Sequence, residues 1–164
     1  MANYIKCGQL FCAKDDTVLN DMAILVEGNR IVSVAPIAEC PPKDGQQIVD
    51  LSGKFVMPGL IDAHLHTSMS GEPDSTNCMY YQRDGELAII SMLNAQEDLL
   101  AGFTTIRDEG SFNYIDLDVK KLIDSGKVFG PRMFVSGVPL SSTGGHGDSH
   151  FKPGITGASM AYIV

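Results

Sequence analysis

His64 and His66 are the residues whose types and spacing point most directly to chemistry. They end the stretch VMPGLIDAHLH (residues 56–66), and they are two of the four histidines in the chain. Side chains alternate faces along a strand, so both imidazoles should project the same way, about 6.6 Å apart. Two imidazoles at that spacing can bind one zinc ion, and the same alternation places Asp62 on their face. The alternative is a pair of histidines hydrogen-bonded at the mouth of a polar loop.

Strand and helix patterns alternate after residue 58, and this order predicts the position of His64 and His66 in the fold. Strand-like stretches cover residues 60–66, 103–108 and 131–137, and helices are expected at 84–101 and 114–125. We expect the apolar stripe of the first helix to be Leu87, Ile90, Leu93 and Leu100. This order predicts parallel strands joined by right-handed crossovers. Ligands of such sheets bind at the carboxyl ends of the strands, where the two histidines stand.

The first 57 residues predict a small all-β unit. Two β-rich runs flank Gly28-Asn29, a pair that tolerates the positive φ of a hairpin turn. Residues 47–57 suggest two further short strands, turned at Ser52-Gly53. No helical period of useful length precedes residue 83.

Composition argues against nucleic acid and membranes as binding partners. The 164 residues carry a net charge of −8, which argues against nucleic acid, and no stretch reaches the ~20 apolar residues of a membrane span. The N-terminus lacks the apolar core of a signal peptide. We therefore expect a cytoplasmic protein with no membrane partner and with reduced thiols at Cys7, Cys12, Cys40 and Cys78.

Three motifs carry a family resemblance. VMPGLIDAHLH resembles the first barrel strand of the amidohydrolase superfamily of metal-dependent hydrolases. AGFTTIRDEG and GPRMFVSGVPLSSTGGHGD are similar to the next two strands of its Xaa-Pro dipeptidase (prolidase)-like and imidazolonepropionase-related subgroup. The resemblance implies an α/β fold with two parts. Residues 1–57 would supply the N-terminal strands of a small composite β-sandwich, and residues 58–164 the first three β/α units of a TIM-like (β/α)₈ barrel that this chain leaves incomplete.

The resemblance also assigns site residues. His64 and His66 match the family's first two metal ligands; zinc is the default among divalent metals, with one or two ions in a complete barrel, although iron, manganese or cobalt would also fit. Gly145, His146 and Gly147 match a segment on the substrate side of the active-site mouth, and His150 is expected to be solvated nearby. We expect Arg107-Asp108 to be a local salt bridge or loop anchor. No catalytic residue can be matched in this chain.

The implied function is metal-dependent hydrolysis of a C–N bond in a dipeptide-like or cyclic amide substrate. Because the family's remaining ligands and proton-transfer group lie on later strands, we expect a truncated N-terminal portion that is inactive alone. One alternative is a non-catalytic metal-binding or assembly module that self-associates as a homo-oligomer or pairs with a separately encoded remainder of the barrel. Another is a free-standing small metal-binding domain in which His146 and His150 complete the ligand set.

Overall fold

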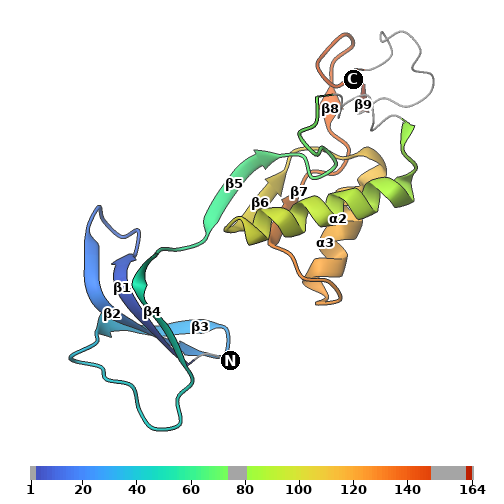
Figure 1. Ribbon diagram of the computed structural model, residues 1–164. Coiled ribbons are helices and arrows are strands. Elements are labelled where there is room, and N and C mark those ends of the chain that lie inside the picture. The colour runs from blue at the N-terminus through green and yellow to red at the C-terminus, as the bar shows by residue number, and fades with distance from the viewer. Residues whose placement is uncertain (1–2, 74–80, 149–161, 164) are drawn as a thin grey trace. The chain divides into compact units, whose positions relative to one another are not determined.

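The computed structural model describes residues 3–73, 81–148 and 162–163 (Figure 1). The chain divides into an N-terminal unit, Met1–Pro58, and a C-terminal unit, Gly59–Val164. This division falls one residue beyond the boundary expected from the sequence. Within the described residues, no helix is long and apolar enough to cross a membrane.

The N-terminal unit is built on one four-stranded mixed sheet in the order β3-β2-β1-β4. Its strands are β1 (Tyr4–Phe11), β2 (Val18–Glu27), β3 (Arg30–Pro36) and β4 (Ile48–Val56). β1 pairs antiparallel with β2 and parallel with β4, and β2 pairs antiparallel with β3. The predicted all-β character of this unit is therefore confirmed, while a second sandwich layer stays a prediction.

The predicted hairpin is present, and it orders the core of this sheet. Gly28 has a φ of 59° in the turn between β2 and β3, a conformation that glycine adopts without steric cost. Its core is a cluster of four buried residues: Cys7, Leu10, Met22 and Ile24. The thiol of Cys7 behaves here as a small apolar side chain, and burial raises its pKa.

The expected turn at Ser52-Gly53 is wrong, because residues 48–56 form one continuous strand. The pairing of β1 with β4 instead shifts register between Cys7 and Gln9, so the extra residues of β4 are absorbed as a bulge. A Cβ added to Gly8 would lie 1.9 Å from the backbone oxygen of Ser52. Only glycine at position 8 therefore permits the close approach of β1 to Ser52 that keeps β4 continuous.

The C-terminal unit contains the three parallel strands that the sequence predicted. β5 (Leu60–Leu65), β6 (Phe103–Asp108) and β7 (Arg132–Val135) form a sheet in that order. They alternate with α2 (Asp84–Leu100), the 3₁₀ turn η1 (Phe112–Tyr114) and α3 (Ile115–Asp124). A further two-residue strand, β8 (Leu140–Ser141), pairs in parallel with β9 (Tyr162–Ile163).

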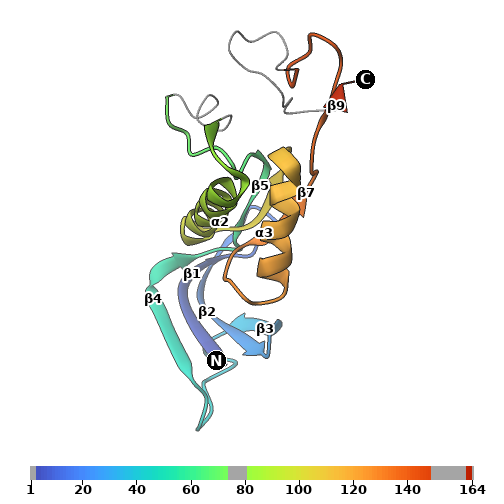
Figure 2. The same cartoon turned by 90° about the vertical axis from the view of Figure 1, so that its right-hand side faces the viewer.

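Both helices pack on one face of this sheet, as the ribbon seen from the side shows (Figure 2). One cluster joins Leu87 of α2 with Ile106 of β6, Met133 of β7 and Val119 of α3. The apolar stripe expected for α2 is confirmed at Leu87, which is buried, while Ile90 is half-buried. It is wrong at Leu93 and Leu100, which are exposed, and the helix buries Ser91 and Ala95 instead. The side chains of Ser91 and Ala95 are small, which lets this part of the helix approach the sheet closely.

Candidate metal centre

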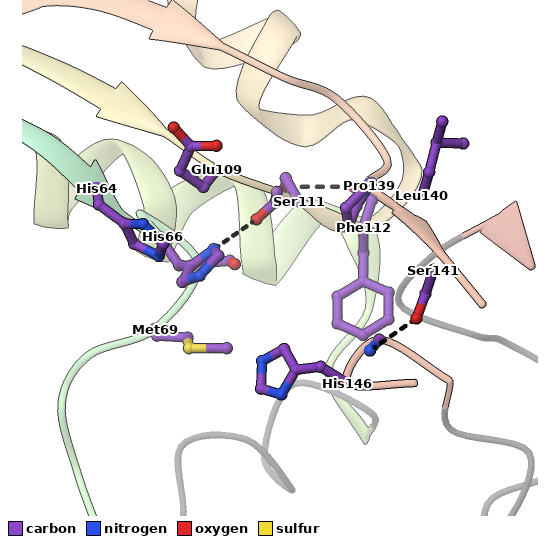
Figure 3. Close-up of a pocket in the computed structure, with 13 residues that line it drawn as sticks. His64, His66, Met69, Glu109, Ser111, Phe112, Pro139, Leu140, Ser141 and His146 are labelled. Carbon is purple, nitrogen blue, oxygen red and sulfur yellow. Dashed lines mark hydrogen bonds between the residues drawn. The ribbon is translucent and has the colours of Figure 1, made fainter. Parts of the chain in front are cut away.

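A cavity of about 300 Å³ opens at the carboxyl ends of β5 and β6, within the C-terminal unit. Its lining includes His64, His66, Ser68, Glu109, Phe112 and His146 (Figure 3). Open parallel sheets bind ligands at this edge, so the cavity lies where the β/α pattern placed a site. His64 and His66 therefore share one pocket with the glycine-loop residue His146, as the sequence suggested.

The two imidazoles of the His-x-His pair lie side by side (Figure 3). Their ring centroids are 5.7 Å apart, with the ring planes at 89° to each other. Nδ1 of His66 lies 3.1 Å from the backbone oxygen of Gly110. A carbonyl oxygen can only accept a hydrogen bond, so Nδ1 must carry the proton and the neutral ring presents its lone pair on Nε2. Metal-binding histidines are commonly fixed in this way by a second partner.

A bulge in β5 sets the direction of these side chains. The pairing of β5 with β6 runs Asp62↔Ile106 and then Leu65↔Asp108, so β5 carries one extra residue between Asp62 and Leu65. The expectation that Asp62 shares the face of the two histidines is therefore wrong. Asp62 pairs with buried Ile106 on the helix-covered face, and the extra residue turns His64 and His66 toward the cavity.

The helix side of Asp62 holds a second acidic residue, Asp98 of α2. Burial, followed by the negative charges of Asp62 and Glu97, raises the pKa of Asp98 above its usual value. Burial and nearby negative charges both disfavour the ionised carboxylate, and for this reason the pKa of Asp98 rises. The charge of Asp62 is thus felt on the face away from the imidazoles.

Asp108 is fully buried at the end of β6 and anchors the loops around the pair. Its Oδ2 accepts hydrogen bonds from the backbone N–H and the hydroxyl of Thr67, at 3.0 and 2.5 Å. Its Oδ1 accepts from the N–H of Gly110, at 3.0 Å. Thr67 follows His66 in the chain, and the backbone oxygen of Gly110 contacts the His66 ring. The carboxylate of Asp108 therefore holds both residues that position the His66 imidazole. The loop-anchor interpretation of Asp108 is confirmed.

Arg107 does not pair with Asp108, as a local salt bridge would have required. Its Nε donates to the backbone oxygen of Ala63, at 2.7 Å, and lies 2.5 Å from Oε1 of Glu109. Glu109 lines the cavity beside the histidines, and sequence reasoning missed it. Its position directly after a strand-end Asp, in the motif AGFTTIRDEG, is the signal that could have identified it.

A second buried carboxylate, Asp116 in the first turn of α3, holds the loop after β7. Its Oδ2 accepts from the N–H of Gly137 at 2.8 Å, and the oxygen of Gly137 accepts from the N–H of the cavity residue Ser111 at 3.0 Å. Burial raises the pKa of Asp116, while its backbone hydrogen bonds oppose that shift. Sequence reasoning had no basis for selecting Asp116, because acidic residues are common in any first helical turn.

The glycine-rich loop brings some of its expected residues to the site. His146 and Gly147 line the cavity, and the N–H of Gly147 donates to the hydroxyl of Ser141 at 3.2 Å (Figure 3). Gly145 shapes the loop instead, because its N–H donates to the oxygen of Ser142 at 2.8 Å. His150 lies outside the described residues. Within those residues, no three His, Cys, Asp or Glu side chains stand close enough to hold a metal ion together.

Ser68 contributes an unusual polar group to the cavity wall. The residue is buried, and its hydroxyl has no hydrogen-bond partner among the residues that the structure describes. Buried hydroxyls are normally satisfied, so one beside a cavity is suited to bind a polar occupant. Sequence reasoning missed Ser68, since a serine after a strand carries no distinguishing signal.

The motifs and this geometry agree with what comparison with known proteins shows. The amidohydrolase family matches residues 55–158. The chain belongs to the amidohydrolase family. That match begins at the end of β4 and covers the His-x-His pair, both helices and the loop that carries His146.

Relatives of this amidohydrolase include enzymes and solved structures. Imidazolonepropionase from Pseudomonas aeruginosa (strain UCBPP-PA14) is 38% identical over 55 residues, covering 34% of this chain and 14% of that protein. Ochratoxinase from Aspergillus niger is 30% identical over 143 residues, covering 85% of this chain and 29% of the relative. A prolidase crystallised with N-methylphosphonate-L-proline superposes with a TM-score of 0.80 at 30% identity, covering 98% of this chain and 40% of that one. The chain thus spans less than a third of the length of either curated relative.

Proposed function

We propose that this chain supplies the first ligands, His64 and His66, of a metal-dependent amidohydrolase that cleaves a C–N bond in a dipeptide-like or cyclic amide. The observation that carries the proposal is the orientation of the His66 ring. Its Nδ1–H donates to the backbone oxygen of Gly110, so the lone pair of Nε2 remains available to bind a metal ion beside the His64 ring. Family membership and the position of the cavity at the strand ends support the same conclusion.

The donor set of the cavity fits a divalent metal ion, with zinc as the default. Two imidazoles from one strand provide borderline-soft nitrogen ligands, and Glu109 adds a negative charge to the wall. A divalent ion supplies Lewis acidity and lowers the pKa of a water molecule. We propose that the remaining ligands and the proton-transfer group come from outside the residues described, and that one or two ions are held in the complete site.

The chain's own residues have distinct tasks in this proposal. His64 and His66 bind the metal, and Asp108, through Thr67 and Gly110, keeps the His66 ring in one orientation. Ser68 and His146 face the occupant of the cavity, and Gly145 and Gly147 shape the loop on the substrate side. Glu109 is held by Arg107 and adds acceptor oxygens to the wall.

The architecture proposed for the whole protein follows the same logic. The strands β5, β6 and β7 would begin a TIM-like (β/α)₈ barrel, and the mixed sheet of the N-terminal unit would form part of a small β-sandwich. Two ligands without a proton-transfer group leave residues 1–164 inactive as an isolated chain in this proposal. The names of the similar proteins, prolidase and imidazolonepropionase, motivate the choice of peptide-like and cyclic amides.

A hydrolysis assay tests the proposal with the complete polypeptide that the gene encodes, loaded with zinc. Xaa-Pro dipeptides and a cyclic imidazolone are the substrates, and residues 1–164 alone serve as a comparison. We expect hydrolysis that a chelator abolishes and that His64→Ala or His66→Ala lowers at least 100-fold, while Asp44→Asn, on an exposed loop of the N-terminal unit, leaves it unchanged. Hydrolysis unaffected by His64→Ala, or absent for every amide tested, would contradict the proposal.

The second candidate is an assembly module, and one observation favours it. The sheet face opposite α2 and α3 leaves Ile61 70% exposed and Phe134 57% exposed, and apolar groups of this size are usually covered. Ile61→Lys tests this candidate by sedimentation. A homo-oligomer of residues 1–164 that Ile61→Lys dissociates would support it, and a monomer at all concentrations would exclude self-association through this face.

A further inference from the structure

We propose that Asp62 and Arg107 are positioning residues that hold the bulge of β5 and so aim His64 and His66 into the cavity. This inference rests on the proposed function of the two histidines as metal ligands. It adds two residues that touch neither the cavity occupant nor the metal, and that act through the backbone between them.

The bulge decides which face the histidines occupy. Residues 62 to 65 of β5 span the same length as residues 106 to 108 of β6. In a regular strand, His64 would share the face of Asp62, which is the face that α2 covers. One extra residue reverses that relation, because a one-residue slip moves every following side chain to the opposite face. The presence of His64 and His66 in the cavity therefore depends on this extra residue.

Two side chains satisfy the backbone groups that the bulge takes out of the ladder. The N–H of His64 donates to Oδ1 of Asp62, at 2.9 Å. The oxygen of Ala63 accepts from Nε of Arg107, at 2.7 Å. A backbone N–H or C=O that leaves the hydrogen-bond ladder destabilises the fold unless it finds another partner. These two contacts supply such partners, and they therefore stabilise the bulged form of β5.

The two contacts hold the bulge from opposite faces of the sheet. Asp62 pairs with Ile106 on the helix-covered face, whereas Arg107 pairs with Phe134 on the other. Arg107 also contacts Glu109 in the cavity wall, so it links the bulge to a second lining residue. The arrangement fixes the Ala63-His64 peptide on both sides, and with it the direction of the His64 side chain.

The N-terminal unit offers a matched control. Asp50 accepts a hydrogen bond from the N–H of Ser52, at 2.9 Å, which is the same contact two residues along a strand, without histidines. Asp50→Ala removes a contact of the same kind in the unit that does not contain the proposed site. Asp62→Asn keeps an acceptor oxygen at the bulge and removes the charge, whereas Asp62→Ala removes the acceptor.

The experiment measures zinc affinity of the complete polypeptide that the gene encodes, by competition with a chromogenic chelator, and hydrogen exchange of its His64 amide without metal. We expect Asp62→Ala to lower zinc affinity about tenfold or more, the range found when residues that orient metal ligands are removed. Asp62→Asn and Asp50→Ala should stay within about threefold of the unchanged chain. Arg107→Met should also weaken zinc binding, whereas Arg132→Met on β7 should not. In the metal-free chain, Asp62→Ala should speed exchange of the His64 amide.

The outcomes separate this inference from the metal site itself. If His64→Ala and His66→Ala abolish zinc binding while Asp62→Ala and Arg107→Met leave it unchanged, the positioning role is wrong and the metal site stands. If neither histidine variant alters zinc affinity, or no zinc binds, the proposed site is wrong. The exchange of the His64 amide then still decides whether Asp62 holds the bulge, and an unchanged rate in Asp62→Ala would refute that.

Discussion

The two units each contain a pairing irregularity beside an aspartate, and the two irregularities serve different ends. In the N-terminal unit, Asp50 accepts from the N–H of Ser52, and the bulge of β4 faces Gly8. In the C-terminal unit, Asp62 accepts from the N–H of His64, and Arg107 binds the neighbouring carbonyl. The same local contact thus accommodates a long strand in one unit and aims a pair of imidazoles in the other.

The difference lies in what surrounds each bulge. The carboxylate of Asp50 is solvent-exposed, and its contacts with Ser52 lower its pKa. The bulge of β5 is instead followed by a loop that the buried carboxylate of Asp108 holds through Thr67 and Gly110. A bulge supports a precise site when the chain beyond it is fixed by buried polar contacts. Four predictions test this contrast.

Removal of the buried anchor should have the largest effect. Asp108→Ala leaves three donors from Thr67 and Gly110 without their acceptor in a buried place, so we expect the free energy of unfolding to fall by about 3 kcal/mol. Urea unfolding followed by circular dichroism measures this loss. Asp50→Ala removes an exposed anchor and should leave the free energy of unfolding nearly unchanged. Equal losses in the two variants would contradict the contrast between the units.

The bulge of the N-terminal unit should depend on close backbone approach. Gly8→Ala would place a Cβ 1.9 Å from the oxygen of Ser52, and we expect a destabilisation of about 2 kcal/mol. Gly53→Ala is the matched control, because an added Cβ there meets nothing within 4 Å. Thermal unfolding of both variants is the measurement. A Gly8→Ala chain as stable as Gly53→Ala would show that the register shift is not needed.

Neighbouring hydroxyls at the end of β5 should respond in different ways. Thr67→Val removes a hydroxyl that donates a hydrogen bond to Asp108, and the free energy of unfolding should fall by about 1–2 kcal/mol. Ser68→Ala removes a buried hydroxyl with no partner among the described residues, so stability should change little or rise. Denaturant midpoints distinguish the two. A large loss in Ser68→Ala would mean that its hydroxyl has a structural partner and is not reserved for a ligand.

The charge on the helix side of the bulge should give a small dependence on pH. The folded chain raises the pKa of Asp98, so it holds that proton more tightly than the unfolded chain does. The resulting penalty is absent below the ordinary value of about 3.9 and is complete above the raised pKa. Asp98→Asn should therefore raise the melting temperature near pH ~7 and leave it unchanged near pH ~3. Asp44→Asn should change neither, and a gain for Asp98→Asn at the lower pH alone would reverse the assigned sign.

Sequence patterns predicted the strands and helices of the C-terminal unit well, although the buried face of α2 did not follow its apolar residues. The pair His64 and His66 was recognisable from its place at the end of an apolar strand. The face of Asp62 was not, because alternation assumes a regular strand and a bulge of one residue reverses it. The continuity of β4 through Ser52-Gly53 was missed for a related reason, since the accommodating glycine lies on another strand.

The supporting contacts were harder to foresee, because they join residues far apart in the chain. Asp108 meets Thr67 across 41 residues, and Arg107 meets Ala63 across 44. Glu109 and Ser68 reach the cavity only because two strands end side by side. Local patterns therefore identified the ligands, while the residues that hold them required the tertiary structure.

The most direct test of the metal centre is a crystal structure of the complete polypeptide soaked with zinc, with anomalous scattering measured at the zinc edge. We predict an anomalous peak about 2.0–2.1 Å from Nε2 of His66 and from a ring nitrogen of His64, with the bulge between Asp62 and Leu65 unchanged. Zinc bound elsewhere on the chain, with the cavity at the ends of β5 and β6 empty, would contradict this assignment.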